Sequence, residues 1–301
     1  MISIVIYTHN DEQTIEWCLD SLRGQQGNRK LNVVVLDDNS SDNTAAVVAQ
    51  RFPEFCLFKE NLRYGWIGLL RKHLPAIGGE VIAFLGAHCR AHHNWISALE
   101  HEMTQGQRII TGRGYHGKQH LLKRFEAASI HADFISEVSR TVTFLWDDNF
   151  AITHKLLREA LPQTDAILSD GAGAALLSLH LQKMGVPIQY CPQVKIDHIT
   201  HSIYQIIEMW SGEIAINAIA IKLADPSLPG AQMLRLGPII AAAFALNRFR
   251  QGIGSLLSAH SSLKTSWFES GIHMFLLALL MPVYYVGLCR EMYKKRDLIW
   301  S

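Results

Sequence analysis

The sequence predicts an α/β fold, built on a mostly parallel, doubly wound sheet with flanking helices and followed by C-terminal apolar helices. Short apolar runs alternate with helical patterns along the first part of the chain, which is the rhythm of strands joined by crossover helices. Near the C-terminus the composition becomes strongly apolar. We therefore expect two domains, an α/β domain over 1–205 and a helical, membrane-associating region over 206–301.

Four apolar runs have the length and composition of buried strands. They lie at residues 3–7, 31–36, 55–59 and 80–85. Ligands bind outside the carboxyl ends of the strands in sheets of this kind. Polar residues follow three of these runs, namely Thr8, Asp38 and His88. The topology therefore predicts that these three side chains gather at one crevice.

Between the predicted strands, apolar residues recur at helical spacing, which predicts helices there. The first helix is expected to begin at Asn10, because Asn is a favoured N-cap and Gln13 completes a pattern that resembles a capping box. A second helix is expected over 44–51 and another over 174–184, ended by Gly185.

The net charge and the cysteine pattern indicate which classes of protein the sequence can belong to. The net charge is only +1, with 18% charged residues, which argues against a nucleic-acid binder because such proteins carry a basic excess. The five cysteines show no C-x-x-C pairing and are expected to be reduced thiols in a cytosolic compartment. The N-terminal run has no signal-peptide features. We therefore expect the catalytic part to face the cytoplasm.

The apolar segment 271–289 is 19 residues long, close to the roughly 20 residues that cross a bilayer as a helix. Basic residues follow it, at positions 290, 294, 295 and 296, and positive charge favours the cytoplasmic side. A buried core helix or a helix that docks on a partner is the alternative. We expect contact with the cytoplasmic face of the inner or plasma membrane, either spanning it or lying in its interface.

A collinear series of short motifs runs through the first 200 residues. It consists of SIVIYTHN at 3–10, VVVLDDNSSDNT at 33–44, NLRYG at 61–65, Arg71, GEVIAFL at 79–85, NFAI at 149–152, and GVPIQYCP at 185–192 with Asp197 and His198. In order and spacing this series resembles family 2 glycosyltransferases of the GT-A fold. The resemblance implies a Rossmann-like sheet that binds a nucleotide-sugar, most simply a UDP-sugar.

The resemblance assigns nucleotide-binding roles to four residues. Asp38 would accept a hydrogen bond from the imide N–H of uridine, with Tyr7 and Thr8 lining the same pocket. Arg71 would hold the diphosphate, for which a guanidinium offers a forked donor. On spacing alone, Asp37 and Asp38 also fit an ordinary polar turn before a helix.

The metal motif departs from the family pattern. The family's D-x-D falls at Gly86-Ala87-His88, so the first carboxylate is missing and the second is an imidazole. The resemblance still implies a divalent cation, held by His88 and His198. Imidazole suits Mn²⁺ better than Mg²⁺. Without a carboxylate at residue 86, this site is expected to be weak.

The catalytic base also departs from the pattern. The family's acidic pair falls at Gly173-Ala174, which cannot accept a proton. Asp170 lies three or four residues earlier and is the candidate base, although Asp at this place would equally cap the following helix.

These features predict an inverting transferase that moves a sugar from a nucleotide-sugar to a lipid-linked or polysaccharide hydroxyl at the membrane. The rival is a GT-A-like protein that has lost catalysis and serves as a binding or scaffold subunit of a polysaccharide-assembly complex, and self-association fits either case. Gly86 and the absent acidic pair favour the rival. A nucleotidyltransferase is not supported, because no Gly-rich phosphate loop follows the first strand.

Overall fold

The computed structural model describes residues 1–25, 31–115, 121–130, 132–161, 172–199, 202–263 and 265–300. The chain folds as two compact units. The first comprises residues 1–115, 136–169 and 177–199, and the second comprises 116–135, 170–176 and 200–301. The second unit therefore takes in two segments from the middle of the chain, which no periodicity in the sequence indicated.

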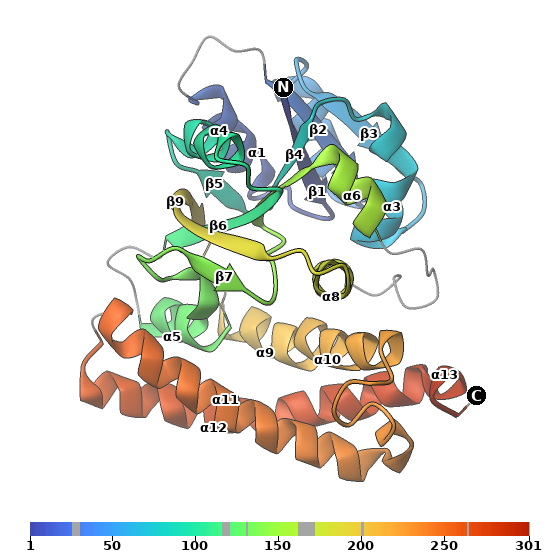
Figure 1. Cartoon of the computed structure of the whole chain (residues 1–301), viewed down its shortest axis with the longest axis vertical. Coiled ribbons are helices and arrows are strands. Elements are labelled where there is room, and N and C mark those ends of the chain that lie inside the picture. Colours follow the sequence, from blue (N-terminus) through green and yellow to red (C-terminus); the bar gives the residue numbers. More distant parts are fainter. Residues whose placement is uncertain are drawn as a thin grey trace. The chain divides into compact units, whose positions relative to one another are not determined.

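One mixed sheet forms the first unit (Figure 1). Its first four strands are parallel and lie in the order β3-β2-β1-β4. They are β1 (Ile2–Thr8), β2 (Asn32–Asp37), β3 (Cys56–Lys59) and β4 (Val81–Leu85). These four strands confirm the strands and the parallel order expected from the sequence.

The sheet continues from β4 in the order β8-β6-β9-β5, with β7 paired to β9. These strands are β5 (Cys89–Ala91), β6 (Ile109–Tyr115), β7 (Arg140–Val142), β8 (Asn149–Thr153) and β9 (Ile188–His198). Only β6 and β9 pair in parallel here, and the other pairs are antiparallel. The arrangement is a mixed α/β sheet, parallel over β1–β4 and largely antiparallel beyond β4.

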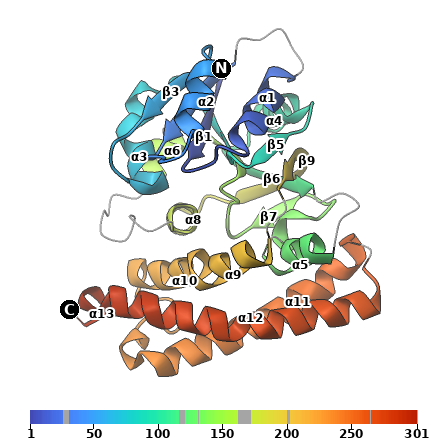
Figure 2. The same cartoon turned by 180° about the vertical axis from the view of Figure 1, so that it is seen from behind.

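Helices accompany the sheet of the first unit (Figure 2). They are α1 (Ile15–Arg23), α2 (Thr44–Arg51), α3 (Gly65–His73) with a 3-10 turn at Leu74–Ala76, α4 (Trp95–Thr104) and α6 (His154–Ala160). Helix α8 (Gly173–Lys183) runs across the division at residue 177.

The first helix begins at Ile15, so the expected start at Asn10 was wrong. Asn10 has a φ of 59°, a left-handed conformation that Asn tolerates better than most residues. Its Oδ1 accepts a hydrogen bond from the backbone N–H of Ser41 at 2.8 Å. Asn10 therefore ties the loop after β1 to the loop after β2.

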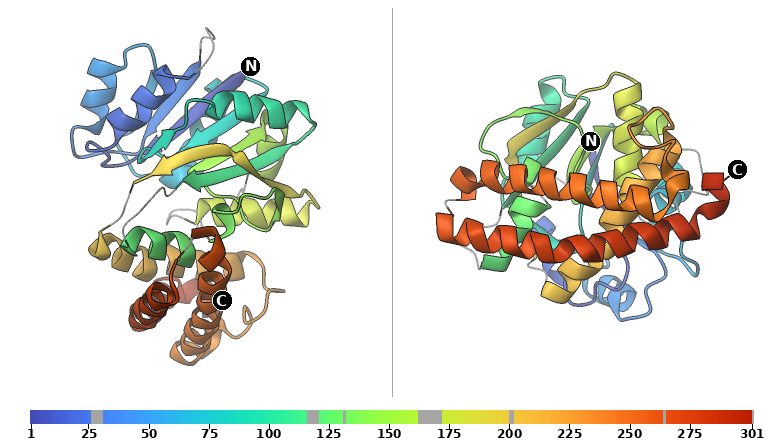
Figure 3. Two further views of the ribbon diagram at one scale, coloured as in Figure 1. Left: turned by 90° about the vertical axis from the view of Figure 1, so that its left-hand side faces the viewer. Right: turned by 90° about the horizontal axis from the view of Figure 1, so that it is seen from below.

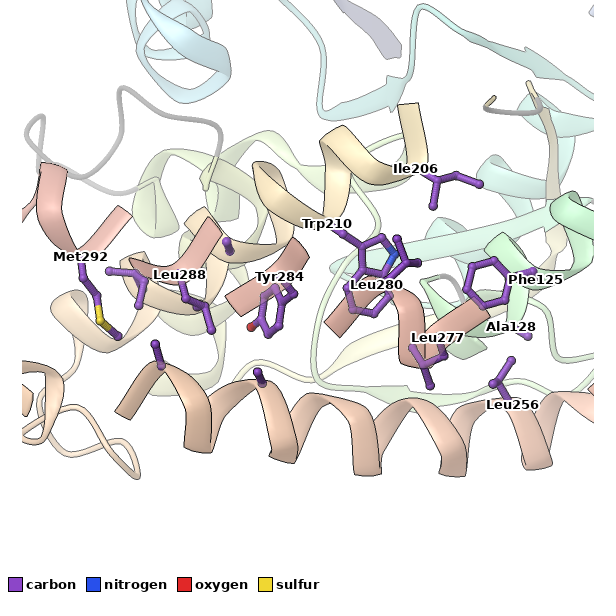
Figure 4. Close-up of a cluster of buried hydrophobic side chains, with 14 of the residues drawn as sticks. Phe125, Ala128, Ile206, Trp210, Leu256, Leu277, Leu280, Tyr284, Leu288 and Met292 are labelled. Atoms are coloured by element: carbon purple, nitrogen blue, oxygen red, sulfur yellow. The ribbon is translucent and has the colours of Figure 1, made fainter. Parts of the chain in front are cut away.

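The second unit is helical. Its elements are α5 (Leu121–Ser129), the 3-10 turns Ala132–Phe134 and Leu234–Leu236, α9 (Ile203–Ser211), α10 (Glu213–Ala224), α11 (Pro238–Leu263), α12 (Trp267–Lys294) and α13 (Arg296–Trp300). The two long helices α11 and α12 lie side by side (Figure 3). Aromatic and aliphatic side chains from α5, α9, α11 and α12 form one buried core (Figure 4).

Helix α12 is the one described helix that is long and apolar enough to cross a bilayer, and a third of its most apolar stretch is buried within the protein. Its inward face packs into the core, but large apolar side chains also point outward. Phe275 is 63% exposed and Val286 is 61% exposed. Length and composition therefore allow membrane contact.

Candidate functional site

The polar residues that follow β1, β2 and β4 lie at one edge of the sheet, because these three strands are parallel neighbours. The edge holds two groups of side chains. The first surrounds Asp38, and the second contains His88, Asp148 and His198. The sequence predicted all of these positions except Asp148.

Asp38 is fully buried and its carboxylate accepts several hydrogen bonds. The Tyr7 hydroxyl donates to Oδ2 at 2.8 Å, and the backbone N–H of Gly65 donates to the same oxygen at 3.0 Å. Oδ1 accepts one bond, from the backbone N–H of Tyr64 at 2.7 Å. The two backbone donors show that Asp38 fixes the start of α3.

One acceptor position of the same carboxylate is not filled by a described donor. A carboxylate oxygen can accept about two hydrogen bonds, and Oδ1 of Asp38 accepts only one among the described residues. Oδ2 is also paired with the half-exposed guanidinium of Arg63, whose Nε lies 3.2 Å away. Burial and the Asp38 carboxylate raise the pKa of Tyr7, which keeps the phenol as a donor.

Thr8 lies between the two groups. It is fully buried, and its hydroxyl donates to the Asp11 carboxylate at 2.8 Å. The backbone N–H of His9 donates to the same Asp11 oxygen at 3.0 Å. The charge of Asp11 raises the pKa values of both Tyr7 and His88, which places Asp11 within electrostatic reach of both groups.

The second group brings two imidazoles and a carboxylate together. Asp148 Oδ2 lies 3.3 Å from Nε2 of His88 and 3.5 Å from Nε2 of His198, and the two imidazole centroids are 4.8 Å apart. Bonds of about 2.1 Å to one metal ion hold donor atoms about 3.0–3.5 Å apart at octahedral or tetrahedral angles. The spacing therefore fits a shared metal ion.

Hydrogen bonding fixes the tautomer of His198. Its Nδ1 lies 2.7 Å from the backbone carbonyl of Ile199, and a carbonyl can only accept, so Nδ1 carries the proton. In the neutral ring, Nε2 then presents a lone pair toward the Asp148 carboxylate. The Nε2 lone pair and the carboxylate oxygen are both acceptors, so they need a proton or a metal ion between them. Metal-binding histidines usually donate their other ring N–H to a backbone carbonyl in this way.

The charges of the two imidazoles and the carboxylate shift the pKa values of His88 and Asp148. Burial alone would lower the pKa of His88, but the Asp148 carboxylate outweighs burial and raises it to about 9. Burial would raise the pKa of Asp148, yet the two imidazoles hold it well below its usual range. The Asp148 carboxylate therefore attracts cationic partners, either protons on the imidazoles or a metal ion in their place.

Cys89 lies close enough to be counted with this group, but it is a weaker candidate ligand. Its side chain is fully buried, and burial raises the pKa of the thiol well above its usual range. The thiolate is the form that binds metals. Its backbone also pairs with that of His198 between β5 and β9, so Cys89 has a structural role as a buried residue of the sheet.

Arg71 lies in the last turn of α3. It comes six positions after Gly65, which corresponds to about 9 Å along a helix, and its role toward the diphosphate stays a prediction. Arg63 is the cation found beside Asp38, and sequence reasoning missed it. The candidate base Asp170 lies outside the described residues.

The sequence matches Glycosyl transferase family 2 over residues 3–161. The chain belongs to this family. It is also 24% identical over 117 residues to the glycosyltransferase AglE of Haloferax volcanii, a match that covers 38% of this chain and 36% of AglE. The chain thus spans about a third of the length of that relative.

Solved glycosyltransferase structures share the fold. The mannosyltransferase PcManGT from Pyrobaculum calidifontis matches with a TM-score of 0.58 and 17% identity, over 99% of this chain and 86% of that one. GalNAc-T7 matches with a TM-score of 0.52 and 14% identity, over 73% of this chain and 48% of that one. These matches confirm the expected GT-A fold, and the family match confirms the expected family.

Proposed function

We propose that this protein transfers a sugar from a nucleotide-sugar to a hydroxyl group of a lipid-linked or polysaccharide acceptor, with inversion at the anomeric carbon, on the cytoplasmic face of a membrane. The meeting of His88, Asp148 and His198 beside the Asp38 group carries the proposal. It gives one sheet edge both a candidate nucleotide pocket and a candidate metal site. All five cysteines are free thiols, which supports a reducing compartment.

The Asp38 group is the proposed nucleotide pocket. The unused lone pair on Oδ1 of Asp38 suits the imide N–H of a uracil, and Tyr7 and Thr8 flank it. The Arg63 guanidinium is the exposed partner of Asp38 and can turn toward the diphosphate, with Arg71 as a second cation for the same group. GalNAc-T7, similar in fold, is described with UDP, and PcManGT with GDP-Man, so both nucleotides belong in the test.

The His88, Asp148 and His198 group is the proposed metal site. Two imidazoles and one carboxylate suit Mn²⁺, and both PcManGT and GalNAc-T7 are described with Mn²⁺. A divalent cation held there would neutralise the leaving diphosphate. His88 and His198 would hold the ion through their Nε2 atoms.

The decisive experiment is a transfer assay with the purified full chain. We expect release of UDP or GDP from one sugar of a UDP- and GDP-sugar panel when Mn²⁺ and membrane lipid extract are present, and loss of release with a chelator. Asp170→Asn should abolish release while UDP affinity stays within about twofold, because a general base acts on the acceptor and not on the nucleotide.

Two results would contradict this. Undiminished turnover by Asp170→Asn would remove Asp170 from the mechanism. Failure of the unaltered protein to bind either nucleotide, with or without Mn²⁺, would favour the scaffold subunit instead.

The membrane contact rests on α11 and α12. Their outward faces carry large apolar side chains, among them Ile239 (74% exposed), Leu246 (70%) and Phe268 (81%). Basic side chains near the end of α12 are partly neutralised within the protein, since Lys294 donates to Glu291 at 2.9 Å. We therefore propose that these helices lie in the membrane interface and bind mainly through apolar burial.

Vesicle co-sedimentation tests this contact. Phe275→Ser/Leu279→Ser on the outward face of α12 should weaken binding to phosphatidylcholine vesicles at least tenfold, because burial of one such side chain is worth about 1.5–3 kcal/mol. Val138→Ser/Phe144→Ser changes exposed apolar residues of the first unit and should leave binding unchanged. An alkaline wash should release the bound protein. Retention after the wash would indicate a spanning helix, and equal losses from both variants would contradict the assignment.

A further inference from the structure

The space beside residue 86 is occupied by another side chain. A Cβ atom built on Gly86 would lie 2.8 Å from Cγ of Asp148 and closer still to its Oδ1, a distance that real Cβ atoms do not reach. Gly86 is not among the glycines with positive φ, so its backbone does not require glycine. Residue 86 is small because the Asp148 carboxylate fills the position where its own side chain would be.

Strand pairing explains why these two residues meet. β4 and β8 are antiparallel, with Leu85 opposite Asn149, so the next pair along is Gly86 and Asp148. The backbone N–H of Gly86 donates to the carbonyl of Asp148 at 3.1 Å. Below them, Phe84 and Phe150 stack with centroids 4.2 Å apart. The register of the two strands therefore holds Asp148 in this place.

Neighbouring side chains aim the carboxylate toward the histidines. The Trp146 indole donates to Asp148 Oδ2 at 3.0 Å, and Oδ2 faces Nε2 of both His88 and His198. Two hydrogen bonds hold the side chain of Asn149, the next residue. Its Oδ1 accepts from the Trp95 indole at 2.9 Å, and its Nδ2 donates to the Val194 carbonyl at 2.9 Å. The carboxylate is thus prepositioned, as a metal ligand must be.

We propose that Asp148, which directly precedes β8, supplies the metal-binding carboxylate that residue 86, directly after β4, lacks. This inference rests on the proposed function only for the presence of a metal ion. A carboxylate just before β8 thus takes the place of a carboxylate just after β4, and Gly86 leaves the space that Asp148 needs. The site is then complete, and the weakness expected from Gly86 alone does not follow.

A reciprocal exchange tests the proposal, with Mn²⁺ binding to the full chain measured by electron paramagnetic resonance and no sugar donor present. Asp148→Ala should weaken Mn²⁺ binding at least tenfold, since removing groups that support a metal ligand already costs about 10–100-fold. Gly86→Asp alone should not strengthen binding, because its side chain meets the Asp148 carboxylate. Gly86→Asp/Asp148→Ala should return the affinity to within a few-fold of the unaltered protein. Asp147→Ala, the neighbouring acid, is the matched control and should change little.

The outcomes separate the two proposals. Unchanged Mn²⁺ affinity in Asp148→Ala, a double variant no better than Asp148→Ala, or no Mn²⁺ binding by the unaltered protein would overturn the role of Asp148. Circular dichroism checks that each variant is folded. If the double variant is not folded, the absorption spectrum of Co²⁺ bound to Asp148→Ala decides. Loss of a metal ligand changes that spectrum, whereas loss of a residue that does not bind the ion leaves it unchanged. Restored Mn²⁺ binding without any sugar transfer would instead count against the proposed function and leave the role of Asp148 standing.

Discussion

Replacement of His198 by alanine is expected to lower sugar transfer by about 100-fold or more. The side chain is almost fully buried, its Nδ1 is committed to the Ile199 carbonyl, and its Nε2 faces Asp148. A metal ion that stabilises charge in the transition state is worth several kcal/mol, and each 1.4 kcal/mol corresponds to a factor of about ten. Removal of this ligand should therefore affect turnover more than the affinity for UDP measured without metal.

His92→Ala is the matched control. His92 is also paired with an aspartate, since its Nε2 lies 3.2 Å from Asp197 Oδ1, but it lies outside the metal group. We expect its turnover to remain within about threefold, because partly exposed pairs contribute about 0–1 kcal/mol. Turnover measured across a Mn²⁺ titration gives the comparison. Equal losses in both variants would mean that His198 acts through stability alone.

The sequence was most informative where local pattern and topology agree. Apolar runs marked β1, β2 and β4, and their parallel order follows from the helices between them. That order is enough to place Tyr7, Asp38 and His88 at one edge. Helix α2 begins and ends at the expected residues. These features depend on contacts between neighbours in sequence or between consecutive strands, which periodicity can reveal.

The remaining features depend on pairings between distant segments. Asp148 meets Gly86 through the antiparallel register of β4 and β8, and single-sequence patterns carry no information about that register. Asn10 fits an N-cap pattern, yet its tie to Ser41 places it in a left-handed turn. Arg63 was passed over because the family motif directed attention to Arg71. The acceptor side remains a prediction, because Asp170 lies outside the described residues.

Among the described residues, Trp210 is the largest fully buried side chain of the helical unit. Trp210 on α9 is fully buried, meets Tyr284 edge-on with centroids 5.9 Å apart, and lies 5.3 Å from the Arg248 guanidinium (Figure 4). Its indole N–H has no hydrogen-bond partner among the described residues. Its stabilising contribution therefore comes from the ring surface and not from the polar atom.

Trp210→Ala is expected to lower the free energy of unfolding by about 3–5 kcal/mol, the usual cost of removing a buried aromatic ring. Trp210→Phe retains most of the ring and removes the unpartnered N–H, so its loss should stay below about 2 kcal/mol. Urea unfolding of the full chain gives both values, and hydrogen exchange over 203–300 locates the change. Similar losses in both variants would mean that a phenyl ring cannot replace the indole, so that the packing of the whole indole ring is required.

A functional consequence follows from the location of the exposed apolar side chains. Those of α11 and α12 belong to the unit that Trp210 stabilises, whereas Asp38 and the histidines belong to the other unit, which has its own core. Trp210→Ala should therefore lose vesicle binding at temperatures where its affinity for UDP is still normal. Parallel loss of both properties would mean that the two units unfold as one cooperative structure, and the membrane contact could not then be assigned to the helices alone.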